Sequence, residues 1–362
     1  MPQSSRVVRP EPVGSIRHTE SSRLQAAGLR EATSLFEQAA EVVPIPRPPQ
    51  PMVIADYGAS TGHNSLVPIG AAIAKLRART RSEHAVLVAH TDVPENDFTA
   101  LFRTLDDDPD SYLRRDKAVF GSAVGRSFYQ QILPSNSVML GWSSWACQWL
   151  SRVPSPVADH VQVAYSGDGD VKAAYARQAA HDWHEFVAFR GRELSPGGRL
   201  VVLTMAIDDE GRFGYRALLD AIVAGLAVLC DGDLLTDDEV RGISVPLVGR
   251  SAEDFRVPFA PKGRFESLTV EHVEVFHAED RFWTQYQSDQ DATVYGAQWA
   301  AFARVSVFPA MADALSGGGA DPRRAEFLDR REKEGVARVA AAPEPMLIPL
   351  AKVVLAKDGA SR

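Results

Sequence analysis

The sequence predicts an α/β fold in which helices cover a mostly parallel sheet that has an antiparallel last strand. Three observations support this prediction. Short apolar runs of strand length alternate with helical patterns up to residue 206. The stretch 52–66 passes from an apolar run through a glycine turn into a helix, as open α/β sheets do where they bind nucleotide-like ligands. A final apolar run, 346–355, can fill an antiparallel edge.

The elements of the predicted core follow one another in the first 206 residues. A helix is expected at 21–40, and the proline-rich connector 44–51 joins it to the first strand, 52–55. Further strands are predicted at 84–90, 118–124, 137–141 and 199–206, and helices at 66–76, 96–105 and 170–194. This alternation is typical of a sheet whose parallel strands are joined by helices.

The remainder of the chain is less regular. It contains predicted helices at 212–230, 237–241, 292–315 and 321–341, a small helix that Ser251 caps, and strands at 266–276 and 346–355. We expect four parts: an N-terminal segment and helix closing the ligand site (1–50), a ligand-binding core (51–206), a cap insertion (207–262), and the rest of the core with additional helices (263–362).

Composition excludes several classes of protein. The formal net charge of −8 disfavours binding to nucleic acid or to acidic membranes. The two cysteines, Cys147 and Cys230, form no C-x-x-C pair, and the histidines show no metal-site spacing, so we expect no metal and a reducing cytoplasm. No apolar run reaches the roughly 18 residues that span a membrane. The N-terminus lacks the apolar centre of a signal peptide.

The glycine turn after the first strand is the first candidate ligand site. Gly58 and Gly62 let backbone N–H groups approach a ligand where a Cβ would collide, and Asp56 offers a carboxylate. The pattern D-x-G-x-S-x-G-x-N fits neither the P-loop nor G-x-G-x-x-G. A carboxylate suits a cation better than a pyrophosphate, which favours S-adenosylmethionine, with its ammonium and sulfonium groups. The alternative is an ordinary α/β turn.

Two further features have both a functional and a structural interpretation. Asp92 ends the second strand, where an acidic residue is positioned for ribose hydroxyls; alternatively, Asp92 or Asn96 caps the next helix. Three tryptophans, Trp142, Trp145 and Trp149, follow the fourth strand. They line the ligand cleft or belong to ordinary core packing.

Four stretches carry a resemblance to a known family. They are IADYGASTGHN, DVPENDFTALFRTL, SFYQQILPSNSVMLGWSSWACQWLSRVP and FRGRELSPGGRLVV. In order and spacing they resemble the SABATH family of S-adenosylmethionine-dependent carboxyl methyltransferases, which contains the salicylate, benzoate and jasmonate methylating enzymes of plants. The match covers about 22–204. It implies a Rossmann-like class I methyltransferase sheet with a largely helical cap, S-adenosylmethionine as cofactor and a small carboxylic acid as substrate.

The resemblance also implies roles for individual residues. Those near the amino-acid end of S-adenosylmethionine would be Ser22, Asp56, Gly58 and Asn64. Those around its nucleoside would be Asp92 at the ribose, and Val93, Ser127 and Phe128 at the adenine. Gln25 and Trp149 would donate hydrogen bonds to the substrate carboxylate, and Trp145 would line its pocket. A homodimer is an expectation that only the plant relatives support.

The chemistry needs no general base, because a carboxylate is already ionised at pH 7. The site has only to desolvate the acid and align it, and orientation alone can supply roughly 7–11 kcal/mol. Three residues differ from the family pattern: Ala59 in the glycine turn, and Trp142 and Trp145 around the paired serines. The family's N-terminal K-G-G-x-G-x-x-S-Y pattern is missing, and His18 stands where its aromatic residue would be.

The predicted cap indicates the substrate. A loose alignment places Leu219 and Val248 at two of its pocket positions, and aliphatic walls favour a medium-chain fatty acid, as in the bacterial fatty acid O-methyltransferases that the chain also resembles. Alternatives are an aromatic acid, or a ring nitrogen, which retention of Gln25 and Trp149 disfavours. Outside the family, the alternatives are a dinucleotide-dependent oxidoreductase and a non-catalytic binding protein.

Overall fold

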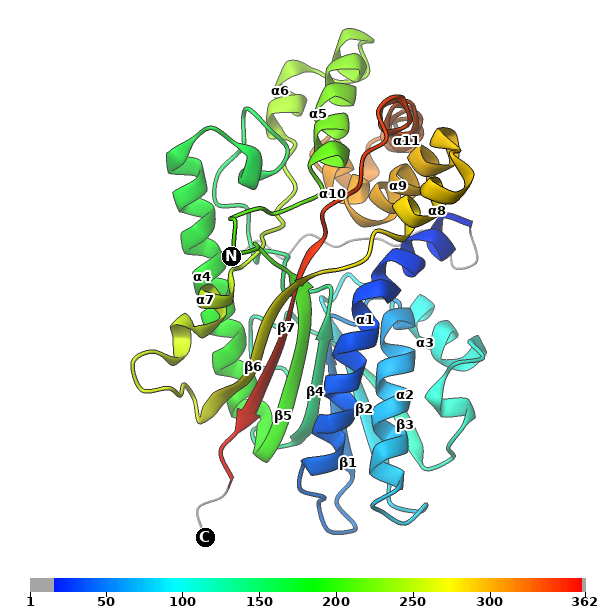
Figure 1. Ribbon diagram of the computed structural model, residues 1–362. Helices are drawn as coiled ribbons and strands as arrows, with labels where there is room; N and C mark the ends of the chain where they lie inside the picture. Colours follow the sequence, from blue (N-terminus) through cyan, green and yellow to red (C-terminus); the bar gives the residue numbers. More distant parts are fainter. Residues whose placement is uncertain (1–15, 360–362) are drawn as a thin grey trace.

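The computed structural model describes residues 16–359, and the side chains of residues 28–359. Its centre is a seven-stranded sheet with the strand order β3-β2-β1-β4-β5-β7-β6 (Figure 1). The strands are β1 Met52–Tyr57, β2 Val86–Asp92, β3 Val119–Gly125, β4 Val138–Ser144, β5 Leu194–Met205, β6 Leu268–His277 and β7 Pro349–Lys357. β1 to β5 are parallel, whereas β7 is antiparallel to both of its neighbours. The prediction of a mostly parallel sheet with an antiparallel last strand is confirmed.

Helices cover both faces of this sheet, which explains why its central strands are almost continuously apolar. On one face, α1 Ile16–Val42, α2 His63–Arg77 and α3 Phe98–Asp107 lie over the side of β1 that carries Ile54 (Figure 1). On the other face, α4 Gly169–Glu193 packs Trp183 and Phe186 against Tyr57 and its neighbours. Successive residues of β1 therefore point to opposite layers.

The cap lies beyond the carboxyl ends of the parallel strands (Figure 1). It combines α5 Arg216–Asp231 and α6 Asp237–Gly242 with a later group, in which α9 and α11 pack on each other and α11 packs on α5. The later helices are α8 Arg281–Asp289, α9 Ala292–Ser306, α10 Phe308–Ala312 and α11 Arg324–Ala341. The cap is thus assembled from two separate parts of the chain.

Two predicted elements have wrong boundaries, and one helix was missed. The helix expected at 292–315 is divided, because Pro309 has no N–H to donate to the preceding turn and lies instead in the first turn of α10. β5 starts at Leu194, five residues before the prediction, and includes Pro196 where its pairing with β4 is irregular. The short helix α8 was not predicted. By contrast, the Ser251 cap is confirmed: Ser251 forms a capping box with Asp254 in the first turn of α7 Ala252–Arg256.

Between residues 16 and 359, none of the helices combines the length and the apolar character that crossing a bilayer requires. In the same part of the chain, no three His, Cys, Asp or Glu side chains lie together as metal ligands would.

Candidate active site

The predicted site residues gather where the strand order reverses. β1 lies between β2 and β4, so the chain leaves β1 toward β2 on one side and later returns through β4 on the other. Ligands of open α/β sheets bind at such a point, outside the carboxyl ends of the strands. Asp56, Asp92 and Trp145 stand at the ends of β1, β2 and β4 respectively, and therefore share this edge.

The glycine turn is held open by its backbone conformation. Gly58 and Gly62 have φ angles of +85° and +79°, in the left-handed region that disfavours a side chain. A Cβ on Gly58 would collide with Ala146 and would lie 3.5 Å from Cε1 of Phe128. The turn therefore touches both the segment after β4 and the loop after β3, which brings the first and third family stretches together.

Asp92 connects the second strand to this turn. Its Oδ2 accepts a hydrogen bond from the Ser60 N–H at 2.7 Å, and its Oδ1 accepts one from the Val93 N–H at 2.8 Å. Asn96 donates to the Ser60 carbonyl at 2.9 Å. Burial raises the pKa of Asp92 to about 6, although both backbone bonds favour the ionised form. Each carboxylate oxygen keeps a lone pair for a further donor.

The alternative interpretation of Asp92 and Asn96 as helix caps is wrong. The cap of α3 is Asp97, whose side chain accepts a hydrogen bond from the Ala100 N–H at 2.9 Å. The sequence offers several capping residues in a row, and only the fold decides which of them begins the helix. Asp92 and Asn96 instead bind the glycine turn.

Asp56 belongs to a buried chain of hydrogen bonds that continues through His90 to Tyr112. Its Oδ2 lies 2.8 Å from Nδ1 of His90, and Nε2 of His90 lies 2.6 Å from the Tyr112 hydroxyl. All three side chains are buried, and burial raises the pKa of Tyr112 above its ordinary value. The other carboxylate oxygen, Oδ1, has no hydrogen-bond partner within the described part of the chain. A buried acceptor without a partner is costly, and it fits a cationic donor supplied by a ligand.

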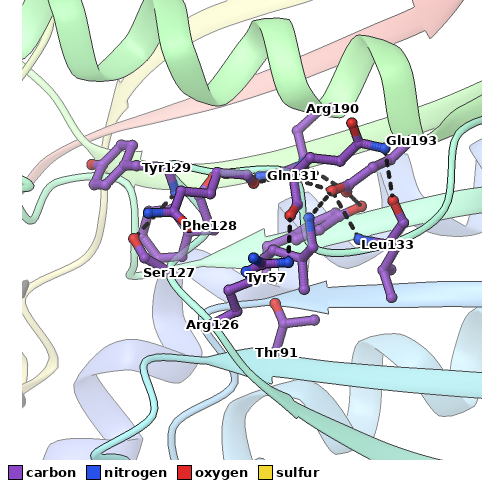
Figure 2. A network of polar contacts seen from close by, with 12 residues as sticks. Tyr57, Thr91, Arg126, Ser127, Phe128, Tyr129, Gln131, Leu133, Arg190 and Glu193 are labelled. Atoms are coloured by element: carbon purple, nitrogen blue, oxygen red, sulfur yellow. Dashed lines mark hydrogen bonds and ion pairs between the residues drawn. The ribbon is translucent and has the colours of Figure 1, made fainter.

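The adenine side of the predicted site is the loop after β3. Ser127 is half-buried, and its hydroxyl accepts a hydrogen bond from the Tyr129 N–H at 3.3 Å. Phe128 is buried against Tyr129 and Phe186, with ring centroids 4.7 and 5.7 Å away. Two residues of α4, Arg190 and Glu193, form hydrogen bonds with the backbone of this loop (Figure 2).

The three tryptophans after Val138 have different environments. Trp142 is fully buried in β4, with its ring centroid 5.1 Å from that of Phe36, so core packing is the correct interpretation for this residue. Trp145 and Trp149 are half-buried and pack against the apolar cluster that includes the cap residues Leu219 and Leu247. Only these two tryptophans are available to a ligand at this edge.

The backbone around Trp145 is unusual. Trp145 has a φ of +56°, an uncommon conformation for a bulky residue and one that often marks functional sites. Its indole N–H is buried and has no partner among the described residues. Trp149 forms a backbone bridge to Leu247, and its carbonyl accepts a hydrogen bond from the Tyr129 hydroxyl at 2.6 Å. The backbone at Trp149 is therefore hydrogen-bonded to both Leu247 of the cap and Tyr129 of the adenine-side loop.

Leu219 and Val248 are not brought together in one cluster. Leu219 of α5 shares the cluster of Trp145 and Trp149. Val248 instead packs with Leu150 and Tyr175, and it lines a cavity of about 710 Å³ between α4 and the cap. The residue before it, Leu247, shares the tryptophan cluster, as expected where neighbouring residues of an extended segment alternate in direction.

The other predicted positions are on α2 and α1. Asn64 lies in the first turn of α2 and is half-buried. Ser22 and Gln25 lie on α1, one turn apart, but their side chains fall outside the described residues.

The sheet order, with β7 antiparallel between β5 and β6, and the acidic residues at the ends of β1 and β2 define a class I methyltransferase fold. Residues 13–330 match the family described as SAM dependent carboxyl methyltransferase, and the chain belongs to this family. The predicted resemblance and the predicted cofactor, S-adenosylmethionine, are confirmed.

Similar proteins include enzymes from fungi and plants. The methyltransferase FUS9 of Gibberella moniliformis is 28% identical over 245 residues, which are 67% of this chain and 65% of that protein. Salicylate carboxymethyltransferase of Clarkia breweri is 26% identical over 250 residues, or 66% of this chain and 67% of that protein. The match therefore spans about two-thirds of these relatives.

One solved structure supports the fold over nearly the whole chain. It is a loganic acid methyltransferase with SAH, with a TM-score of 0.75 and 20% identity, and the alignment covers 97% of this chain and 99% of that one.

Sequence reasoning missed the side chains that hold the site residues. His90 and Tyr112 fix Asp56, and Arg190 and Glu193 fix the loop of Ser127 and Phe128. A signal existed for the second pair, because both residues lie in the fourth family stretch. For His90 the only signal was a polar residue at the end of an apolar run.

Proposed function

We propose that this protein is an S-adenosylmethionine-dependent carboxyl O-methyltransferase that converts a medium-chain fatty acid to its methyl ester. One observation carries the proposal: Trp145 and Trp149 stand at the end of β4, beside the reversal of strand order, and pack against an apolar cap. An apolar chain can lie under the cap while its acid group reaches the edge of the sheet. Membership of the SAM dependent carboxyl methyltransferase family supports this reaction class.

The described residues fit the cofactor. The unpaired Oδ1 of Asp56 suits an ammonium group, and Asn64 lies on the helix that follows the same turn. Asp92 retains acceptor capacity for two ribose hydroxyls, next to Val93. When bound, S-adenosylmethionine supplies an electrophilic methyl group. In this proposal Ser22 holds its carboxylate, Gly58 allows its close approach, and Ser127 and Phe128 flank its adenine.

The protein's contribution to the reaction is to hold and desolvate the acid. The Trp149 indole N–H and the Gln25 amide donate to the carboxylate and leave one lone pair free for attack on the methyl group. Apolar neighbours exclude water from the acid, and the fixed orientation lowers the barrier. The ionised acid gives up no proton, so no residue has to act as a base.

The shape of the cap favours an aliphatic substrate. The apolar cluster shared by both tryptophans contains Leu218, Leu219, Ile222, Val245 and Leu247. These flexible or branched side chains pack around an alkyl chain at little cost. The same cluster contains Phe213, Tyr215 and Phe308, so an aromatic acid of the salicylate or benzoate type is the second candidate. Family membership disfavours the dinucleotide-dependent oxidoreductase.

A competition among acids tests the proposal. Octanoate, salicylate and benzoate are offered to the purified protein with labelled methyl donor, and methyl esters are quantified. We expect octanoate to give the highest kcat/KM. Preference for salicylate would refute the fatty acid and keep the reaction class. Binding of S-adenosylhomocysteine in calorimetry without methylation of any acid would refute the reaction class.

A further inference from the structure

The buried ion pair of Arg190 and Glu193 forms hydrogen bonds within the pair and also to the adenine-side loop. Arg190 and Glu193 lie at the end of α4, and both side chains are completely buried. The guanidinium binds the carboxylate twice, with Nε–Oε2 and Nη2–Oε1 distances of 3.0 and 2.9 Å. Such two-pronged pairs fix geometry strictly. A buried ion pair contributes little to stability, because the cost of removing both charges from water offsets their attraction.

The pair holds the backbone of the loop that follows β3. Arg190 donates to the carbonyls of Phe128 and Gln130 at 2.6 and 2.9 Å. Glu193 Oε1 accepts from the N–H groups of Ile132 and Leu133 at 2.6 and 3.1 Å. Figure 2 shows these contacts converging on one carboxylate and one guanidinium. The loop has no regular secondary structure of its own, and this pair holds four of its backbone groups.

The same pair reaches the end of β1. The Tyr57 hydroxyl donates to Glu193 Oε2 at 2.7 Å, and the Arg190 guanidinium lies 4.3 Å from the centroid of the Tyr57 ring. Burial raises the pKa of Tyr57 well above its ordinary value, so the phenol keeps its proton for this bond. Tyr57 immediately precedes Gly58, and Gly58 approaches Phe128. The glycine turn and the adenine-side loop therefore share one anchor.

From this arrangement we infer that Arg190, Glu193 and Tyr57 are positioning residues for the cofactor, which set the spacing between the glycine turn and the loop of Ser127 and Phe128. The inference rests on the proposed function, in which these two segments enclose S-adenosylmethionine. None of the three side chains touches the ligand in this scheme. Their loss weakens cofactor binding and leaves the rate at saturating cofactor nearly unchanged.

The mildest test is Tyr57→Phe, which removes one hydroxyl and keeps the ring under Arg190. We expect the KM for S-adenosylmethionine and the dissociation constant of S-adenosylhomocysteine to rise about three- to tenfold, the range for one hydrogen bond. The kcat is expected to stay within about twofold, because the donors to the acid are untouched. Arg190→Lys keeps the charge but loses the fork, and we expect a larger rise.

Two matched variants control for stability. Tyr295→Phe removes a buried hydroxyl that donates to the Glu344 carbonyl at 2.6 Å, within the cap. Arg323→Lys is the counterpart of Arg190→Lys, because the Arg323 guanidinium donates to both oxygens of the buried Glu239 carboxylate, at 3.1 and 2.6 Å. Both are expected to lower the melting temperature as much as their counterparts while the KM for S-adenosylmethionine stays unchanged.

The outcomes separate the inference from the function on which it rests. Wild-type protein that fails to bind S-adenosylhomocysteine in calorimetry refutes the proposed function. Wild-type and Tyr57→Phe proteins that bind it equally refute only the positioning role. Equal KM changes in Tyr57→Phe and Tyr295→Phe also refute that role, since they would trace the effect to stability alone. Should Arg190→Lys fail to fold, Tyr57→Phe decides the matter.

Discussion

The sheet edge and the cap are built by opposite means. At the edge, the site is held by hydrogen bonds of polar side chains: Asp56 binds His90, Asp92 binds the backbone of the glycine turn, and Arg190 and Glu193 bind the backbone of the adenine-side loop. In the cap, Leu219 and its neighbours are held by apolar packing. Directional bonds suit an invariant polar ligand, whereas packing suits a substrate recognised by shape. We therefore expect polar substitutions at the edge to cost far more than volume-conserving substitutions in the cap.

The largest effect is expected for Asp92→Asn. This change keeps the shape of the side chain but removes the charge from an acceptor of two backbone N–H groups, Ser60 and Val93. Hydrogen bonds to a charged group contribute about 1.5–3 kcal/mol each, so affinity for S-adenosylhomocysteine should fall by at least about 100-fold. Calorimetry measures this affinity for S-adenosylhomocysteine. Asp97→Asn, at the cap of α3, serves as the control and should bind normally; normal binding by Asp92→Asn would exclude a role at the ribose.

The next effect concerns the acid rather than the cofactor. Trp149→Phe removes the indole donor and should cost about 1–3 kcal/mol of transition-state stabilisation, seen as a lower kcat/KM for octanoate. Trp142→Phe is the matched change in the core beside Phe36, and it should lower the melting temperature without a specific loss of kcat/KM. If the two variants lose the same activity, the role of Trp149 as donor is wrong.

Cofactor affinity should depend on pH through Asp92, whose folded pKa of about 6 lies above its ordinary value. Between the unfolded and folded values, the native state binds more protons, so this group stabilises the unliganded fold less as pH rises through the window. Ribose hydroxyls donate best to the ionised form. Affinity for S-adenosylhomocysteine should therefore fall below pH 6, by about tenfold per pH unit at most. Titrations from pH 7 to 5 test this, and Asp92→Asn should flatten the curve.

The smallest effect is expected in the cap. Leu219→Met conserves volume in the apolar cluster and should cost less than about 1.5 kcal/mol of unfolding free energy. Affinity for S-adenosylhomocysteine should stay the same, while the preference between octanoate and salicylate shifts by a few-fold. Thermal denaturation and competition assays measure both quantities. A large loss of cofactor affinity would show that the cap and the sheet edge are not separable.

Much of the sheet edge could be predicted because its signals are local. A strand, a glycine turn and a helix occupy consecutive residues, and carboxylates at strand ends follow from the same pattern. The anchors of that edge could not be predicted in this way. Arg190 contacts Phe128, which is distant in sequence, and the burial that creates the need for this contact arises only when α4 packs on the sheet. Likewise, the sequence suggested Asp92 or Asn96 as the cap of α3, and only the tertiary structure shows that Asp97 caps this helix.

By itself, the sequence determined the order of strands and helices, the glycine turn after β1 and the residue types at the edge of the sheet. These depend on side-chain size, backbone freedom and periodicity, which act over a few residues. The tertiary structure decided that Trp142 is core while Trp145 and Trp149 face the cap, and that Leu247 rather than Val248 joins them. Which way a side chain points at such positions depends on the packing of elements far apart along the chain, and no local pattern records it.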